Sequence, residues 1–272
     1  IDPLMREIYH KCGGKYLFTT QKSILAGDQT SLCYNFDIFF SLGNKSHLRA
    51  RSYDSDISKV IPIGSLFYHQ RMVNNVKNQI NSNNFHEYKK YDLLYVGGNI
   101  MNFYELYDHY DNFMNDYYES IRWLTQIKKK YPKLRIGIKH HPSAGIDRFE
   151  RDIIRESGVE LIDKQLESYK LVEDSKVCVT YASTLGYESF LFKKCCLFLD
   201  PNNNNNFIAY DGESEIVDKY RVSNFNEFDM KINLILSNDK DFLSYERKFL
   251  DDIIIYKEDP YKIIFNTLKD IK

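Results

Sequence analysis

The sequence lacks the features that mark several common classes of protein. Its 272 residues include five cysteines, but no two of them form a Cys-x-x-Cys pair, which argues against a zinc ribbon or a thioredoxin-like motif. Cys178, Cys195 and Cys196 lie in or beside apolar runs, which favours buried free thiols and a reducing, cytoplasmic setting. No run approaches the ~20 consecutive apolar residues that a membrane-spanning helix needs.

Strong charge of one sign is also absent. The formal net charge is −1, so no basic field favours nucleic acid, and we expect no nucleic-acid partner. The basic run Lys128-Lys129-Lys130 suits the C-terminus of a helix, where cations oppose the helix dipole. The chain has no Gly-x-Gly-x-x-Gly motif, and the pair Asp54/Asp56 stands in a polar stretch. We therefore expect neither a bound metal nor a cofactor.

Strand-like and helix-like segments alternate along the chain, which predicts an α/β protein with parallel sheets in three layers. The expected strands cover 15–20, 36–43, 59–65, 91–96, 134–139, 159–162, 176–180 and 197–200. The expected helices in the second half cover 113–131, 147–157, 168–174 and 187–193.

The pattern indicates two domains of unequal completeness. Residues 1–75 read as a partial N-terminal α/β domain, residues 76–90 as a linker rich in Asn and Lys, and residues 91–272 as a complete Rossmann-like domain with C-terminal helices. The sequence starts at Ile1 rather than Met, and no acidic residue before position 70 sits at a convincing strand end. We therefore expect a longer protein whose upstream part holds the general base.

Two polar motifs directly follow predicted strands of the second domain. The first is Lys139-His140-His141-Pro142-Ser143, and the second runs from Ser183-Thr184 through Gly186 to Glu188. Ligands bind at the carboxyl ends of the strands in open α/β sheets. Hydroxyl groups and free N–H groups at the start of a helix suit a phosphate. Together the motifs predict a nucleotide-binding edge.

Each motif residue has a structural alternative. His141 can donate a hydrogen bond to a phosphoryl oxygen and protonate a leaving phosphate, or it can be a strand-end histidine without a ligand. His140 should point the other way and act in support. Ser183 and Thr184 can bind phosphate, cap a helix, or do both. Glu188 can accept the two ribose hydroxyls or be a solvated helix residue.

Other residues at the ends of predicted strands are also candidates for ligand contact. Gly97, Gly98 and Asn99 would let a ligand approach the backbone closely, although a tight turn explains them equally well. Lys139 and Asp200 are additional candidates for contact with the same ligand.

At these motifs the chain resembles the C-terminal nucleotide-binding domain of the GT-B glycosyltransferases that build bacterial capsule and lipopolysaccharide. His141-Pro142 with Ser183-Thr184 resembles the bacterial sialyltransferases, the Kdo transferases and the polyol-phosphate polymerases. Glu188 resembles the ribose-binding Glu of the wider GT-B superfamily. The resemblance is best over residues 91–205.

The resemblance implies a GT-B-like fold and a metal-independent transferase with His141 as its catalytic residue. The donor would be a CMP-, CDP- or UDP-linked sugar or sugar-like unit, held by residues 97–99, 139–143, 183–184, Gly186 and Glu188. The acceptor would be an oligosaccharide or lipid-linked glycan, and a peripheral contact with the inner face of the membrane would be compatible with that role.

Two other functions stay open. A nucleotide-sugar 2-epimerase or hydrolase of similar fold would need no acceptor, and a non-catalytic module would bind a nucleotide or glycan without turning it over. Incubation of the protein with donor, with and without acceptor, separates the three.

Overall fold

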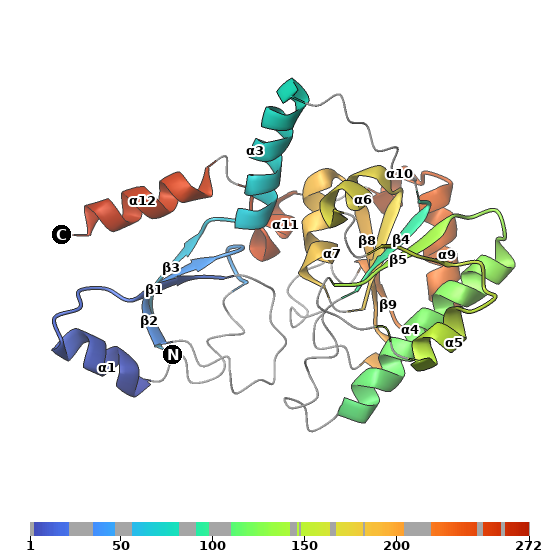
Figure 1. Ribbon diagram of the computed structural model, residues 1–272, viewed down its shortest axis with the longest axis horizontal. Coiled ribbons are helices and arrows are strands. Elements are labelled where there is room, and N and C mark those ends of the chain that lie inside the picture. Colours follow the sequence, from blue (N-terminus) through green and yellow to red (C-terminus); the bar gives the residue numbers. More distant parts are fainter. Residues whose placement is uncertain are drawn as a thin grey trace. The chain divides into compact units, whose positions relative to one another are not determined.

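The chain forms two compact units in a computed structural model, shown in Figure 1. By their internal contacts, the first unit comprises residues 1–85 and 246–272, and the second comprises residues 86–245. The structure describes residues 3–21, 35–46, 56–81, 91–97, 110–141, 146, 148–163, 167–181, 183–203, 219–243, 247–256 and 259–271. Within these ranges, no helix combines the length and the apolar character needed to cross a membrane.

The first unit is built on a small parallel sheet. Its described elements are α1 (Pro3–Lys11), β1 (Phe18–Thr20), β2 (Asn35–Ser41), β3 (Asp56–Pro62), α3 (Leu66–Asn81), α11 (Arg247–Ile253) and α12 (Pro260–Asp270). The strands lie in the order β1-β2-β3, and both pairings are parallel. One core cluster joins Ile38, Phe40 and Ile63 to apolar side chains of α12. The three strands expected in this part of the sequence are thus present, with shifted ends.

The expected linker at 76–90 is partly helical. Helix α3 runs to Asn81, and it contains neither Gly nor Pro that would break it. The Ser65 hydroxyl oxygen accepts a hydrogen bond from the backbone N–H of Tyr68 at 3.1 Å, which is the contact of a helix N-cap. A long run of Asn, Lys and Gln without a breaker is compatible with helix, so polarity alone is a poor sign of a linker.

The C-terminal residues also differ from the expected boundary, because residues 246–272 belong to the first unit by their contacts. The backbone N–H of Asn44 donates to the Asp251 carbonyl at 2.9 Å, and that of Ile255 donates to the Leu42 carbonyl at 2.8 Å. These long-range bonds hold the segment beside the end of β2. Helical periodicity in the C-terminal sequence does not reveal which core the helix covers.

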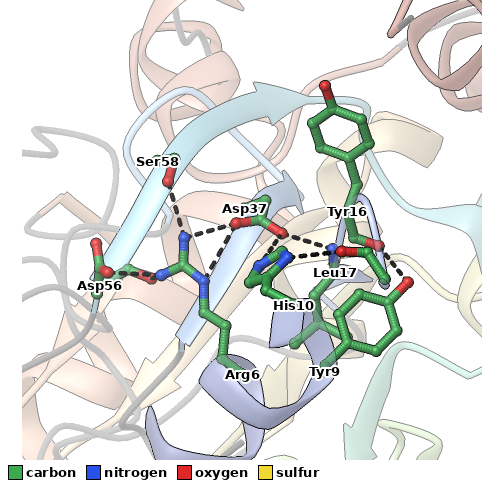
Figure 2. Close-up of polar contacts among 9 residues, drawn as sticks. Arg6, Tyr9, His10, Tyr16, Leu17, Asp37, Asp56 and Ser58 are labelled. Carbon is green, nitrogen blue, oxygen red and sulfur yellow. Dashed lines mark hydrogen bonds and ion pairs between the residues drawn. The ribbon is translucent and has the colours of Figure 1, made fainter. Parts of the chain in front are cut away.

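Helix α1 is held against the start of the first sheet by a polar cluster around Asp37, shown in Figure 2. The Arg6 guanidinium contacts Asp37 Oδ1 and Asp56 Oδ2, each at 2.6 Å. The Leu17 N–H donates to Asp37 Oδ2 at 2.6 Å, and His10 Nε2 lies 3.1 Å from the same oxygen. Burial alone would raise the pKa of Asp37, but the Leu17 N–H, Arg6 and His10 outweigh it and lower that pKa.

We expect the stability supplied by Asp37 to depend on pH. A carboxyl whose folded-state pKa is lowered stabilises the fold above its unfolded pKa, and this contribution is lost as the pH falls through the folded value. Asp37→Asn should therefore be less stable than the parent near neutral pH, with the gap narrowing in acid. Urea titrations from neutral pH to ~3 measure this gap, and a gap that is constant with pH would contradict the assignment.

The second unit contains a larger parallel sheet. Its described elements are β4 (Leu93–Val96), α4 (Tyr110–Lys130), β5 (Ile136–Lys139), α5 (Arg148–Ile154), β6 (Glu160–Leu161), α6 (Ser168–Asp174), β7 (Val177–Thr180), α7 (Thr184–Glu188), the 3-10 turns η3 (Ser189–Phe192) and η4 (Pro201–Asn203), β8 (Cys195–Leu199), β9 (Arg221–Val222), α9 (Phe225–Leu236) and α10 (Lys240–Leu243). The described strands lie in the order β6-β5-β4-β7-β8-β9.

Helices cover both faces of this sheet. Figure 1 shows α6 and α7 on one side, with α4, α5 and α9 on the other. On the first side, the ring centroids of Tyr187 on α7 and Phe198 on β8 lie 4.5 Å apart. On the other side, Trp123 of α4 and Phe228 of α9 are in contact, with ring centroids 6.2 Å apart. The arrangement confirms the three-layer α/β prediction. Strand β9 was not expected, because its two residues lie in no apolar run like the one at 159–162 that indicated the equally short β6.

All pairings in this sheet are parallel, so the carboxyl ends of the strands share one edge. Strand β4 lies between β5 and β7. The edge therefore places Gly97, after β4, between the histidine pair that follows β5 and the Ser183 turn that follows β7.

Candidate functional site

The turn after β4 is closely packed against the histidine pair. A Cβ atom added at Gly97 would lie 3.3 Å from His140 Nδ1 and 3.6 Å from His140 Cα. The Gly97 N–H donates to the Lys139 carbonyl at 2.9 Å. Only a residue without a side chain leaves this space open. Gly98 and Asn99, which we expected to continue the turn, lie outside the described residues.

The two histidines point to different surroundings, as strand alternation predicts. His140 is buried, and its Nε2 lies 2.9 Å from Oε1 of the buried Glu150 on α5. His141 is exposed at the strand end. Lys139 is buried beneath the turn, and its Nζ donates to the His140 carbonyl oxygen at 3.3 Å. Pro142 and Ser143, the remaining members of this motif, lie outside the described residues.

Ser183 is the N-cap of α7. It has an extended backbone with φ −153°, and its hydroxyl oxygen accepts from the Leu185 N–H at 3.3 Å. Helix α7 continues directly into the 3-10 turn η3, so the helical segment is longer than α7 itself. Ser183 and Thr184 are both partly exposed. Capping is therefore a real role of Ser183, and a role in phosphate binding is compatible with it.

Gly186 and Glu188 lie on the buried side of α7. A Cβ atom at Gly186 would meet Thr180 Cγ2 at 2.6 Å and Cys196 Sγ at 3.0 Å, so the glycine lets the helix approach β7 and β8. Glu188 is only 4% exposed, and its Oε2 accepts a hydrogen bond from the Tyr169 hydroxyl at 2.8 Å. Glu188 is thus not a solvated helix residue.

Acidic side chains gather at the end of β8. Asp200 is fully buried, and the Arg221 Nε donates to its Oδ2 at 2.6 Å. Asn202 Nδ2 donates to Asp116 Oδ1 on α4 at 2.6 Å. Burial, and then the nearby charge of Asp200, raise the pKa of Asp116, although the Asn202 bond opposes this. Asp200 is engaged within the protein, and the described residues contain no cluster of three potential metal ligands.

Sequence reasoning missed two residues of this edge, Glu150 and Tyr169. Glu150 stands in the first turn of α5, where an acidic residue is favoured by the helix dipole and so draws no attention. Tyr169 is one of 22 tyrosines. In both cases the signal is a tertiary contact with a side chain outside the residue's own helix, which the local pattern does not contain.

Searches with the sequence find no matching family model and no matching curated protein. Solved structures do match. One is UDP-GlcNAc 2-epimerase from Neisseria meningitidis bound to UDP-GlcNAc, with a TM-score of 0.53 and 17% identity over 86% of this chain and 62% of that one. Another is UDP-GlcNAc 2-epimerase from Methanocaldococcus jannaschii in complex with UDP-GlcNAc and UDP, with a TM-score of 0.55 and 13% identity over 86% and 61%.

A third match is the complex of S. aureus MnaA with UDP, with a TM-score of 0.55 and 13% identity over 86% of this chain and 59% of that one. The chain therefore spans about three fifths of the length of these structures. At such low identity the matches show the fold, which is GT-B-like. They include 2-epimerases rather than the sialyl-, Kdo- or polyol-phosphate transferases that the motifs resemble, so that narrower family is not shown.

Proposed function

We propose that this chain binds a nucleotide sugar at the carboxyl edge of its second sheet and takes part in an enzymatic reaction of that sugar. The observation that carries the proposal is the common edge of two motifs far apart in the sequence. His141 follows β5 and Ser183 follows β7, on either side of β4. A sheet edge of this kind is where α/β proteins bind nucleotides.

In this proposal, different side chains bind different parts of the nucleotide. Ser183, Thr184 and the exposed His141 face the phosphates with hydroxyl and imidazole donors. The Glu188 carboxylate, whose Oε2 is held by Tyr169, offers its acceptor capacity to the ribose. Gly97 allows the ligand to approach the backbone between the two motifs.

The reaction that fits best is epimerisation at C2 or hydrolysis of a UDP-sugar. Its support is the GT-B-like fold shared with UDP-GlcNAc 2-epimerases, two of which were solved with UDP-GlcNAc bound. Glycosyl transfer to a surface glycan is the second candidate, favoured by the His141-Pro142 and Ser183-Thr184 motifs. A binding module without activity is the third.

An acceptor-omission assay separates these functions. The 272-residue chain is first titrated with UDP, CDP, CMP and GDP by calorimetry and then incubated with UDP-GlcNAc in D₂O. Epimerisation breaks the C2–H bond, so deuterium enters the sugar without an acceptor. Consumption of donor only when an oligosaccharide is added would instead indicate transfer. Failure of all four nucleotides to bind would overturn the proposal.

We expect the double variant Ser183→Ala/Thr184→Ala to weaken binding of the best nucleotide by about 1–3 kcal/mol, because hydrogen bonds to a charged phosphate are lost. Stability should fall by roughly 1 kcal/mol, the usual effect of a lost N-cap. Isothermal calorimetry and urea unfolding measure the two quantities.

Asn224→Ala provides a matched control. Asn224 caps α9 in the same unit, accepting from the Glu227 N–H at 3.0 Å, but it follows the edge strand β9 instead of β7. It should cost similar stability and leave nucleotide affinity unchanged. Equal affinities in the double variant and the parent would limit Ser183 and Thr184 to capping.

A further inference from the structure

We propose that Glu150 is a positioning residue of the candidate site: its carboxylate holds the ring of His140 and thereby the turn that carries His141 to the edge of the sheet. Its effect on ligand binding rests on the proposed function, whereas its effect on the His140 ring can be measured without any ligand.

The first observation is that α5 inverts the usual order of burial. Phe149 is 50% exposed, whereas the adjacent Glu150 is 2% exposed. Arg148 and Arg151, on the same turn, are also exposed. Burying a carboxylate while a neighbouring phenyl ring stays in water costs free energy on both counts, unless the carboxylate gains a partner. The packing of α5 alone does not explain why Glu150 faces inward.

One such partner is His140. Its Nε2 lies 2.9 Å from Glu150 Oε1, and the two side chains are only 4% and 2% exposed. The two atoms lie within hydrogen-bond distance but are not aligned as a hydrogen bond, so a rotation of the ring is needed to turn a proton on Nε2 toward the carboxylate. With the ring in that orientation, the carboxylate selects Nε2 as the nitrogen that carries the proton. Removal of one member of such a buried pair strongly destabilises the fold, because the other member is left buried without compensation.

On the Nδ1 side, the ring lies close to Gly97: a Cβ atom added at Gly97 would be only 3.3 Å from Nδ1. The ring thus lies between Glu150 of α5 and the turn after β4. The His140 carbonyl oxygen also accepts from Lys139 Nζ at 3.3 Å. Ring and backbone of His140 are both restrained, and His141 is the next residue along the chain.

Tyr95 of β4 is buried, interacts with the charge of Glu150, and adds no charge of its own. Burial, and then the charge of Glu150, raise the pKa of Tyr95 well above its ordinary value, so the phenol is neutral at physiological pH. The Glu150 carboxylate contacts the His140 ring, whereas Lys139 Nζ donates to the backbone carbonyl oxygen of His140.

Two substitutions at Glu150 separate positioning from packing. Glu150→Gln keeps an oxygen that can accept from Nε2–H, and Glu150→Leu fills similar space without an acceptor. We expect Glu150→Leu to weaken UDP binding about tenfold and Glu150→Gln about twofold, since the Leu variant loses the buried polar contact with His140 and the Gln variant keeps it. The matched control is Asp152→Asn, on the same helix and 46% exposed, which should leave the affinity unchanged.

Nitrogen-15 NMR of the histidine side chains shows which ring nitrogen of His140 carries the proton. A purely structural role of Glu150 would not change that preference. In the parent and in Glu150→Gln, the His140 ring should carry its proton on Nε2, and in Glu150→Leu this preference should be lost. Gly97→Ala perturbs the same ring from the other side and should weaken UDP binding roughly threefold without touching Glu150.

The failures of the two proposals are distinguishable. If the parent binds none of the nucleotides, the proposed function fails, and the NMR of the parent and Glu150→Leu still decides the role of Glu150. If the parent binds UDP and Glu150→Leu binds it equally well, or the His140 tautomer is unchanged in Glu150→Leu, the positioning role is overturned while the proposed function stands. Equal losses in the Gln and Leu variants would also overturn it.

Discussion

Replacement of Gly64 by alanine is expected to lower the free energy of unfolding of the first unit by about 3 kcal/mol. Gly64 has φ +86°, a conformation that L-residues rarely adopt. A Cβ atom there would lie 2.2 Å from the carbonyl oxygen of Ile255, which is a backbone atom and cannot move aside. Urea unfolding of the variant and the parent measures the loss.

Gly13→Ala is the matched control for this prediction. Gly13 has almost the same backbone conformation, φ +90°, but among the described residues no atom beyond its chain neighbours lies within 4 Å of a Cβ placed there. It should cost only about 1 kcal/mol, the intrinsic strain of a left-handed L-residue. Equal losses of stability in Gly64→Ala and Gly13→Ala would show that Ile255 does not pack on the turn after β3. The assignment of the C-terminal segment to the first unit would then be wrong.

Replacement of Gly186 by alanine should have the second largest effect, a loss of about 2 kcal/mol in stability together with weaker nucleotide binding. The added Cβ would lie 2.6 Å from Thr180 Cγ2 and 3.0 Å from Cys196 Sγ, both in the core of the second unit. Helix α7 must move away from the sheet to relieve these contacts. Because Ser183 caps this helix, the movement displaces the proposed phosphate site.

A second substitution tests the cause. Thr180→Ser removes Cγ2 but keeps the hydroxyl that donates to the Val96 carbonyl at 2.7 Å. In a double-mutant cycle, Thr180→Ser should restore part of the stability and affinity that Gly186→Ala loses. Strict additivity of the two substitutions would mean that the clash at Thr180 is not the origin of the loss.

Much of the architecture could be predicted because it depends on local patterns. Short apolar runs bounded by polar turns indicated strands that the structure confirms, with ends shifted by a few residues, and helix α6 was predicted at its actual bounds, Ser168–Asp174. Strand β9 and helix α3 were not predicted. The first lies in no apolar run that would mark it as a strand, and the second has a polar composition that resembles a linker.

The sequence by itself determined the alternation of strands and helices and the position of each polar motif at the end of a strand. These are properties of neighbouring residues, because hydrophobic period and turn chemistry act over a few positions. The tertiary structure alone decided that β5 and β7 flank β4, that Glu150 pairs with His140, and that residues 246–272 join the first core. Each of these depends on how separate strands and helices pack against one another, and no local pattern of residues encodes it.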